Sequence, residues 1–574
     1  MKILPRKIFL IAALILSVPP SASAQSAYDI LAEMPVQHNG RIKPFESFSR
    51  EAALTVTGKN NFQGIPPTRL VWNWIAKPEK WAPEPMIPVA LKTLQEEFSL
   101  MLIRGRVSPE TVLHHRAFIE KTQHAIMRKD RKEKLSFEDQ KRIEIYDRAL
   151  FFQEIANGSL PGWIAHPDDP KAGWLPLKAF AGAEGGELLA QFFPPEKAAQ
   201  VSGNFQKLLF LLRKEGASEE LFEAASDYAL SLENLFESRG IILDHETLKR
   251  ELAYNRLRPF KWAWKLYLLS ALFLTGLLLF EKKVTASFIF QSSGLKQGAA
   301  AAGLVSFLAG FAVHFYGFFL RCLIAGRPPV TNMYESVIWV SWGVALFSLI
   351  LFGVYRTLFI PLTAGCVAGF ALIIAESFPV VLDASLSPLV PVLRSNFWLT
   401  IHVLTITLSY AAFALAWGLG HGVIFSFVFS RDPIQAHQKL SRFLYRAMQI
   451  GVILLASGTV LGGVWANYSW GRFWGWDPKE TWAVIALLGY LLVLHGRFAG
   501  WLGNFGIAVG SVAAFLGVIM AWYGVNFVLA AGLHSYGFGG GGAPYVFAVA
   551  GADLLLIALA AFSYKRNQKA VPSF

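Results

Sequence analysis

Cysteine is scarce in this chain, which has only two, Cys322 and Cys366, among its 574 residues. Both lie inside apolar runs. The sequence therefore contains no disulfide framework, no Cys-x-x-Cys redox pair and no Cys-x-x-Cys-His sequence of the kind to which haem is covalently attached. The protein classes that depend on those features are excluded.

Residues 26–258 lack a different feature, an apolar run long enough to span a bilayer. Charged residues recur every few positions there, and apolar residues fall at three- and four-residue steps, as from Leu221 to Phe236. Turns rich in proline and glycine, at 64–67, 83–88 and 158–176, separate the helical stretches. We therefore predict a soluble, mainly helical domain over residues 26–258.

Three histidines of this domain lie close in sequence: His114, His115 and His124. The cysteine or carboxylate spacing of a metal site does not accompany them. We interpret them as surface residues of helices, so this domain offers no recognisable chemistry.

The first residues are typical of a secretory signal. Lys2, Arg6 and Lys7 precede the apolar run 8–16, and small residues at Ala22 and Ala24 supply a cleavage pattern. We predict a signal peptide over residues 1–25, with an uncleaved anchor as the alternative. Either one directs the following domain out of the cytoplasm.

From residue 259 onward the composition changes. Apolar residues make up 54% of the whole chain, and its mean hydropathy is +0.40. These values are typical of a membrane protein with a sizeable soluble part. We predict an all-α polytopic membrane domain over residues 259–574 with about nine transmembrane helices, at 262–280, 300–321, 337–355, 358–376, 397–427, 447–465, 480–498, 505–530 and 545–563.

Basic residues give this domain an orientation. The formal net charge is +13, and lysines and arginines cluster after the first, fifth and ninth spans, as at Lys282, Arg442 and Arg566. These three loops fall on one side, which the positive-inside rule makes cytoplasmic. The signal peptide independently puts the soluble domain on the other side. The positive charge thus indicates topology, and we expect the lipid bilayer, not a nucleic acid, as its partner.

The stretch 465–482, WANYSWGRFWGWDPKETW, packs five tryptophans, a tyrosine and a phenylalanine into eighteen residues. Indole rings at a membrane boundary suit a planar, apolar ligand with polar edges, because each ring buries a large area while its N–H still finds a partner. An aromatic belt that anchors the protein in the membrane is the simpler interpretation, and it accounts for a tryptophan or two at each helix end.

Two histidines share a membrane face with this stretch. The chain crosses twice between His402 and the tryptophans, and twice again before His534, so all three lie on the same side whichever way the protein is inserted. Two neutral imidazoles there can supply opposed axial nitrogen ligands to a haem iron, with the aromatic stretch packed on the porphyrin. A capped or hydrated histidine at a helix end is the simpler interpretation of either residue alone.

Asp477 begins the seventh span. Asp477, Pro478 and Glu480 have the spacing of an N-cap, a proline in the first helical position and a capping-box partner. We therefore interpret Asp477 as a structural residue that also fixes how the preceding tryptophans face a ligand. The cations Arg394, Arg472 and Lys479 could pair with haem propionates, although snorkelling at the interface explains them more simply.

His495 lies deeper, about fifteen residues into the seventh span, or roughly 22 Å at 1.5 Å per residue. An ionisable group at that depth indicates a functional site, with snorkelling toward the nearby Arg497 as the alternative. His314 and His421 are the candidates for a second ligand facing His495, and the depth of His421 fits better.

Several segments together resemble one family. The runs GRPPVTNMYESVIWVSW, LRSNFWLTIHVLTITLSYAAF, GGVWANYSWGRFWGWDPKETWA and GVNFVLAAGLHSYGF occur in the order expected of CcsA, also called ResC, of system II cytochrome c synthesis. The resemblance covers residues 300–540, and WGRFWGWDPKETW is similar to the WWD signature of haem-handling proteins. The segment LAEMPVQHNGRIKPFESFSREA resembles extended bacterial members of the same group.

The resemblance implies a role for each matching residue. It makes His402 and His534 the paired external haem ligands, places Trp470, Trp474, Trp476 and Asp477 in the WWD core, and makes His495 a transmembrane haem ligand. Haem b would be both bound ligand and substrate. The implied activity is that of a holocytochrome c synthase component in the bacterial inner membrane, attaching haem through thioether bonds to the CXXCH motif of apocytochrome c outside.

The chain shows no recognisable CcsB (ResB) half, which in the family contributes another transmembrane histidine and a large external domain. The resemblance therefore implies a separately encoded CcsB-like partner. The WWD loop and the N-terminal domain would both face the periplasm. A haem exporter that delivers haem without attaching it is the alternative function. A respiratory subunit with b-type haems is disfavoured, since such proteins hold haem between facing histidines in mid-membrane.

Overall fold

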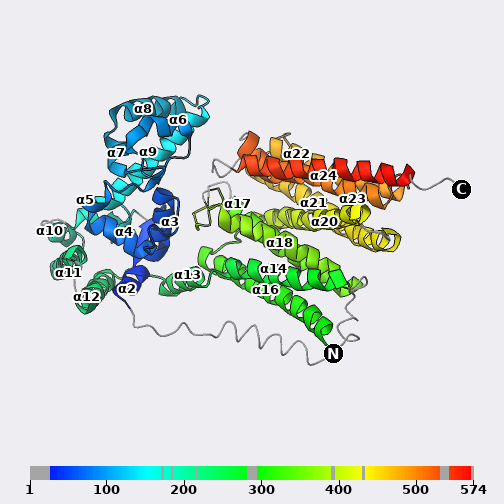
Figure 1. The fold of residues 1–574 in the computed structure, drawn as a ribbon. Coiled ribbons are helices and arrows are strands. Elements are labelled where there is room, and N and C mark those ends of the chain that lie inside the picture. The colour runs from blue at the N-terminus through cyan, green and yellow to red at the C-terminus, as the bar shows by residue number, and fades with distance from the viewer. Residues whose placement is uncertain are drawn as a thin grey trace. The chain divides into compact units, whose positions relative to one another are not determined.

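The computed structural model describes residues 26–169, 173–181, 185–214, 218–280, 294–379, 381–389, 395–429, 433–529 and 542–569. The predicted signal peptide, Arg394 and His534 lie outside these residues. The described chain forms two compact units, one ending at Arg256 and the other beginning at Leu257. Figure 1 shows the arrangement of the helices within each unit.

The N-terminal unit is mainly helical, as predicted. Its helices are α2 (Ala27–Glu33), α3 (Phe45–Thr57), α4 (Pro67–Ala76), α5 (Pro78–Trp81), α6 (Lys92–Phe98), α7 (Pro109–His114), α8 (Arg116–Asp130), α9 (Phe137–Ala156), α10 (Gly185–Ala190), α11 (Pro195–Lys214), α12 (Ser218–Glu237) and α13 (His245–Leu257), with short 3-10 turns η1 (Ser99–Met101) and η2 (Leu177–Ala179). The periodic stretch from Leu221 to Phe236 lies within α12 and buries Tyr228 and Leu232. His115 caps α8, because its Nδ1 accepts a hydrogen bond from the Phe118 amide at 3.1 Å.

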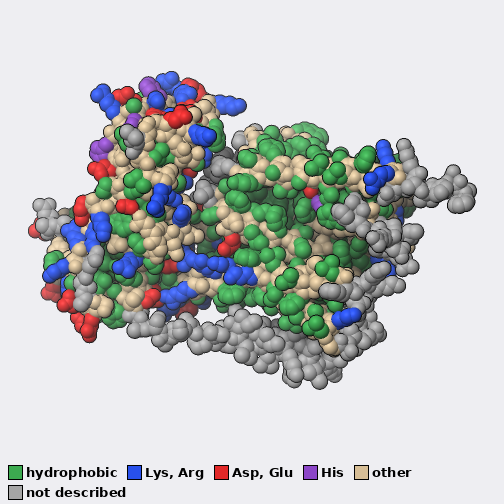
Figure 2. Space-filling model, in the orientation of Figure 1, with side chains coloured by type: hydrophobic (Ala, Val, Ile, Leu, Met, Phe, Trp, Pro, Cys, Tyr) green, Lys and Arg blue, Asp and Glu red, His purple; other side chains and the backbone are tan. Residues whose placement is uncertain are grey.

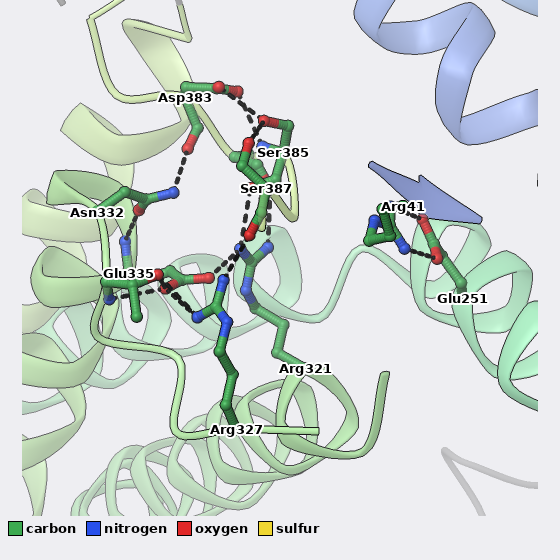
Figure 3. Close-up of polar contacts among 11 residues, drawn as sticks. Arg41, Glu251, Arg321, Arg327, Asn332, Glu335, Asp383, Ser385 and Ser387 are labelled. Carbon is green, nitrogen blue, oxygen red and sulfur yellow. Dashed lines mark hydrogen bonds and ion pairs between the residues drawn. The ribbon is translucent and has the colours of Figure 1, made fainter. Parts of the chain in front are cut away.

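A small antiparallel sheet, which the sequence did not predict, joins these helices. Its order is β2 (Arg41–Pro44), β1 (Pro35–His38), β5 (Gly162–Ile164) and β6 (Leu175–Pro176), and β3 (Ile87–Pro88) pairs separately with β4 (Arg106–Val107). Asn39 and Gly40 connect β1 to β2 with φ of 51° and 72°, the left-handed conformation that favours Asn-Gly in tight hairpins. Arg41 then donates two hydrogen bonds to Glu251 of α13, at 2.6 and 2.8 Å (Figure 3).

The second unit is a helix bundle. It consists of α14 (Pro259–Phe280), α16 (Leu295–Ala325), α17 (Met333–Tyr355), α18 (Phe359–Ser377), α19 (Asn396–Trp398), the π-helix η4 (Leu399–Val403), α20 (Leu404–Phe429), α21 (Pro433–Trp470), α22 (Pro478–Phe498), α23 (Asn504–Ile519), the π-helix η5 (Met520–Leu529) and α24 (Ala543–Lys569). Figure 2 shows hydrophobic side chains over most of the visible face of this bundle.

Nine helices in the described part of the chain are long and apolar enough to cross a membrane, which confirms the predicted all-α multi-pass fold. The sixth span was predicted too short. It was expected to cover residues 447–465, but α21 continues to Trp470, so Trp465 and Trp470 are both helical. Aromatic residues are tolerated in a helix, and α21 ends only at Gly471, whose φ is +70°.

Helix α20 packs against α17, α18, α21 and α23. Close approach depends on small residues: a Cβ at Gly451 of α21 would lie 2.4 Å from the Phe413 ring of α20. The same Phe413 ring stacks on Tyr490 of α22, with centroids 3.8 Å apart and planes 12° apart. Small residues at helix crossings let the two helices come into close van der Waals contact. This contact stabilises the packing within lipid, because burying apolar surface gives no driving force there.

Candidate functional site

His402 lies in the π-helix η4, directly before α20. Its Nδ1 is 2.8 Å from the carbonyl oxygen of Gly458 on α21. A carbonyl only accepts hydrogen bonds, so Nδ1 carries the proton and the lone pair of the neutral ring is on Nε2. This is the tautomer in which Nε2 can bind a metal, and the orientation of the ring is fixed by a partner on another helix.

The His402 ring also packs closely on α21. A Cβ at Gly462 would lie 2.6 Å from its Cε1 atom, and the Trp465 ring meets it edge-on with centroids 5.6 Å apart. Trp398, one helical turn before His402, lies nearly parallel to Trp465 at 6.2 Å and 8°. An imidazole with a fixed tautomer therefore lies beside paired indole rings, which fits a flat metal-containing ligand such as haem.

Trp474 and Trp476 occupy a short loop, residues 471–477, between α21 and α22, and Trp482 lies in α22. Trp474 and Trp476 meet edge to face, with centroids 5.8 Å apart and planes 88° apart. Trp476 has φ of 55° and is 70% exposed. Large aromatic side chains held at a helix junction and left open are available for contact with a ligand.

Asp477 has the capping geometry predicted for it. Its side chain accepts a hydrogen bond from the Lys479 amide at 3.0 Å, and Glu480 closes the capping box by accepting from the Asp477 amide at 3.1 Å. Glu480 also accepts from the Gly475 amide at 2.8 Å. The start of α22 thus fixes the backbone of the tryptophan loop on both sides of Trp476.

Two of the three predicted cations have partners within the protein. Arg472 lies 3.5 Å from Glu480, with its guanidinium 5.8 Å from the centre of the Trp470 ring. The Lys479 ammonium donates to the side chain of Asn526 in η5 at 3.2 Å. These contacts join the tryptophan loop to η5, the segment that leads toward His534. The structure thus places positive charge beside the loop, with each head group oriented by a protein partner.

His495 lies near the other end of α22. Its Nδ1 is 2.8 Å from the Leu491 carbonyl, so its lone pair is also on Nε2. The side chain is exposed on the bundle surface, on the same helix face as Leu488 and Leu492, which are 58% and 69% exposed.

His314 does not fit the role of a second ligand. It is fully buried, its Nε2 lies 3.0 Å from the Ile338 carbonyl, and its Nδ1 lies 3.3 Å from the Tyr267 hydroxyl. Both ring nitrogens are hydrogen-bonded within the bundle.

Both ring nitrogens of His421 are also hydrogen-bonded within the bundle. Its Nδ1 lies 2.9 Å from the Trp417 carbonyl and its Nε2 lies 3.1 Å from Asp553 of α24, which also accepts from the Trp417 indole at 2.9 Å. Neither histidine can bind iron without losing these partners, so neither candidate for the position opposite His495 is supported. The sequence could not show this, because the depth of a histidine in the membrane does not reveal its hydrogen-bond partners.

Sequence reasoning missed three residues of this site. Trp398 was detectable, since an aromatic residue four positions before a functional histidine faces the same side of a helix. Gly458 and Gly462 form a small-xxx-small pattern, which indicates a close helix crossing but not which side chain it receives. The contact between these glycines and His402 required the structure.

These features define a multi-pass membrane protein with an imidazole and indole rings brought together at one end of a helix bundle. Residues 330–534 match the family described as "Cytochrome C assembly protein". The "Cytochrome c biogenesis protein CcsA" of Prochlorococcus marinus (strain AS9601) is 35% identical over 272 residues, 42% of this chain and 86% of that protein. The chain therefore belongs to this cytochrome c assembly family, which includes CcsA, and the resemblance is confirmed.

A second similarity covers more of the chain. "Protein NrfI" of Wolinella succinogenes is 30% identical over an alignment of 517 residues that covers 87% of this chain and 53% of that protein. The similarity extends well beyond the helix bundle into the N-terminal unit, and the chain spans about half the length of NrfI.

Proposed function

We propose that this protein presents haem outside the cytoplasm and attaches it to the CXXCH motif of an apocytochrome c, together with a CcsB-like partner. The observation that carries the proposal is His402, whose Nδ1 bond to Gly458 leaves the lone pair on Nε2 beside Trp398 and Trp465. Membership in the cytochrome c assembly family supports the same function.

The proposed reaction adds two cysteine thiols to the two vinyl groups of haem. In each addition the sulfur bonds to one vinyl carbon and the hydrogen goes to the other, so nothing leaves. Haem supplies the vinyl groups, and the protein orients them. His402 and His534 would be the axial ligands, while Trp470, Trp474 and Trp476 would hold the ring so that one edge meets the thiols.

Asp477 contributes through the backbone. Its cap and the bonds of Glu480 to the Gly475 and Asp477 amides fix the loop that carries Trp474 and Trp476. The chemistry needs a fixed distance between haem edge and thiol, and a capped helix start supplies a rigid support. The apocytochrome's own histidine must finally take one axial position, so one external ligand is expected to be displaceable.

The exposure of His495 supports a partner chain. Within the described bundle, both His314 and His421 have their ring nitrogens hydrogen-bonded, whereas His495 is exposed next to Leu488 and Leu492. A transmembrane haem bound at His495 would therefore take its opposite ligand from a CcsB-like subunit seated on that face of α22. Residues 26–258 are proposed to lie on the periplasmic side of the bacterial inner membrane, with the tryptophan loop.

The test is to express the full chain with a CcsB-like partner and a reporter apocytochrome, and to compare the unmodified protein with His402→Ala and His534→Ala. We expect both substitutions to lower bound haem and to abolish the covalently haem-stained reporter. His114→Ala, in the N-terminal unit, is the control and should change neither. Unchanged attachment in both test variants would contradict the ligand assignment. Haem that is retained at the site but never attached to a CXXCH peptide would favour a haem exporter.

A further inference from the structure

The segment η4, which carries His402, is a single π-helical turn between α19 and α20. The Leu404 amide donates to the Leu399 carbonyl, five residues back, where an α-helix would use the carbonyl four residues back. Such turns are rare, usually interrupt an α-helix once, and are frequent at functional sites. The extra residue rotates the chain before the turn by about 100° relative to the helix after it. The path of η4 therefore decides which way His402 faces.

Segments on both sides of this turn contact α21. Before the turn, Trp398 lies nearly parallel to Trp465, and within the turn His402 reaches the Gly458 carbonyl. After the turn, α20 packs along α21 (Figure 1). In an uninterrupted α-helix, Trp398 and α20 would be out of phase by about 100°, so they could not both face α21 as they do. The π-turn is thus needed to bring His402 and Trp398 together on this side of α20.

Two threonine hydroxyls bond to backbone carbonyls beside His402. Thr405 donates to the Ile401 carbonyl and Thr407 donates to the Val403 carbonyl, each at 2.5 Å. A hydroxyl that bonds the carbonyl four residues back competes with the backbone amide for it and bends the helix. The two threonines therefore favour a departure from the regular ladder at this turn.

A third side chain holds the turn from a different helix. The Leu404 carbonyl accepts from the Thr407 hydroxyl at 3.3 Å and from the Trp339 indole of α17 at 3.4 Å. The Trp339 ring is itself held in place, because it stacks on Trp342 with centroids 5.0 Å apart and lies 4.9 Å from the Phe318 ring of α16. The junction of η4 and α20 is thus braced against α17. We call Thr405, Thr407 and Trp339 the η4 clamp.

One hydroxyl of this kind does not produce a π-turn. Thr363 donates to the Phe359 carbonyl at 3.0 Å, yet α18 stays α-helical at that point. The η4 clamp differs because its donors act together on the carbonyls of residues 401, 403 and 404, on both sides of His402.

From this arrangement we propose that the η4 clamp positions His402 for haem ligation. It holds η4 in its π-helical path, and this path directs the imidazole to Gly458 and Nε2 to the place of the iron. The inference rests on the proposed function, because the positioned nitrogen is the proposed axial ligand. Thr405, Thr407 and Trp339 are positioning residues, since they act on His402 through the backbone.

The experiment removes the two hydroxyls and then restores them. The valine pair is Thr405→Val with Thr407→Val, which keeps the size and β-branching of threonine and loses the donors. The serine pair is Thr405→Ser with Thr407→Ser, which keeps the donors. Each is made in the full chain and expressed with the CcsB-like partner, beside His402→Ala and the unmodified protein.

Three readouts are taken per amount of monodisperse protein. They are the absorbance spectrum and reduction potential of bound haem, covalent attachment to the reporter, and the rate at which diethyl pyrocarbonate modifies His402 in the haem-free full chain, followed by mass spectrometry. For the valine pair we expect a shifted spectrum and potential, a several-fold faster modification of the released ring, and attachment reduced by up to about 100-fold. The serine pair should stay close to the unmodified protein.

Thr363→Val is the matched control for the hydroxyls. Thr363 makes the same kind of bond in α18, and it is 8% exposed where Thr407 is 6% exposed. All three readouts should stay unchanged in this variant, because its loss affects a regular helix that does not carry His402.

Trp339→Phe tests the clamp by a second route and serves if the valine pair does not fold. Phenylalanine keeps an aromatic ring in the stack but removes the donor to the Leu404 carbonyl. It should shift spectrum and potential in the same direction by a smaller amount. Trp342→Phe is its control, since the Trp342 indole nitrogen has no hydrogen-bond partner among the residues that the structure describes. That variant should change none of the readouts.

The outcomes separate this inference from the proposed function. If His402→Ala lowers bound haem while the folded valine pair and Trp339→Phe change no readout, the positioning role is wrong and the proposed function stands. A serine pair that is as impaired as the valine pair would also overturn the inference, because the hydroxyls would not be the cause. If His402→Ala leaves haem content and attachment unchanged, the proposed function is wrong, and the role of the clamp in haem ligation is wrong with it.

Discussion

The Nδ1 atom of His402 and the carbonyl oxygen of Gly458 are 2.8 Å apart, and the two residues are on different helices. This single contact fixes the protonation pattern of the imidazole and its orientation. It also makes the crossing of α20 and α21 part of the proposed haem site, because a glycine one turn further along α21, Gly462, leaves room for the ring.

Gly462→Ala should displace the His402 ring. The added Cβ would lie 2.6 Å from Cε1, closer than real Cβ atoms approach, and 3.1 Å from Nδ1. We expect the hydrogen bond to Gly458 to be lost, with a several-fold fall in bound haem and in covalent attachment, measured by absorbance and by haem staining. Gly353→Ala is the control, since a Cβ there meets no described atom within 4 Å. Equal haem content in both variants would show that the glycine does not position the ring.

Substitutions of Asp477 distinguish a capping residue from a reacting carboxylate. Asparagine caps a helix about as well as aspartate, whereas alanine costs about 1 kcal/mol. We expect Asp477→Asn to retain most of the attachment activity and Asp477→Ala to lower both thermal stability and attachment. The measurements are thermal unfolding in detergent and haem staining of the reporter. Loss of attachment in Asp477→Asn with normal stability would instead assign the carboxylate a part in the reaction.

Asp553 should be a structural partner of His421 and not part of the haem site. Alanine at this position removes the acceptor for both the His421 ring and the Trp417 indole, and breaking a buried pair costs about 3–5 kcal/mol. Asp553→Asn keeps an oxygen that accepts from the indole and an amide group that can face a neutral imidazole. This variant should therefore lose much less stability than the alanine variant. Thermal unfolding of the two variants checks this order, and the spectrum of bound haem should be the same in both.

The N-terminal unit should become less stable in acid through Glu51. Burial alone raises the pKa of this carboxylate, but its contacts with His38 and the buried Lys43 more than offset burial, and the pKa lies below its usual range. A lowered pKa stabilises the folded state above the unfolded pKa of about 4.3, and that stabilisation is lost as pH falls through the folded value.

Glu51→Gln should therefore destabilise the protein at pH 7 by about 3–5 kcal/mol, the typical cost of leaving one partner of a buried pair alone. The difference from the unmodified protein should shrink as the pH falls below about 4. Hydrogen exchange of β1 and β2 in the full chain measures both effects. Glu120→Gln is the control, because Glu120 and its partner Arg116 are 59% and 92% exposed and should contribute little at any pH. A constant difference across pH would contradict the assignment to the Glu51 charge.

Much of the architecture could be predicted from periodicity and composition. Apolar runs of span length predicted the nine helices in the described residues that are long and apolar enough to cross a membrane, and three- and four-residue steps predicted α12. The spacing of Asp477, Pro478 and Glu480 predicted the capping box that begins α22. These features are local, because each depends on residues within a few turns of one another. The predicted end of α21 is too early, because a cluster of tryptophans does not by itself end a helix.

The sequence by itself determined the family, the multi-pass fold and the placement of His402 and the tryptophans at the same end of the bundle, because alternation of crossings needs only their count. Tertiary structure decided which partners each histidine has. His402 and His495 each direct Nδ1 to a carbonyl oxygen. His314 and His421 each have both ring nitrogens hydrogen-bonded, with partners up to 47 and 132 positions away in the chain. Hydrogen-bond partners on distant helices leave no local pattern, so only the packed bundle distinguishes a candidate ligand from a structural histidine.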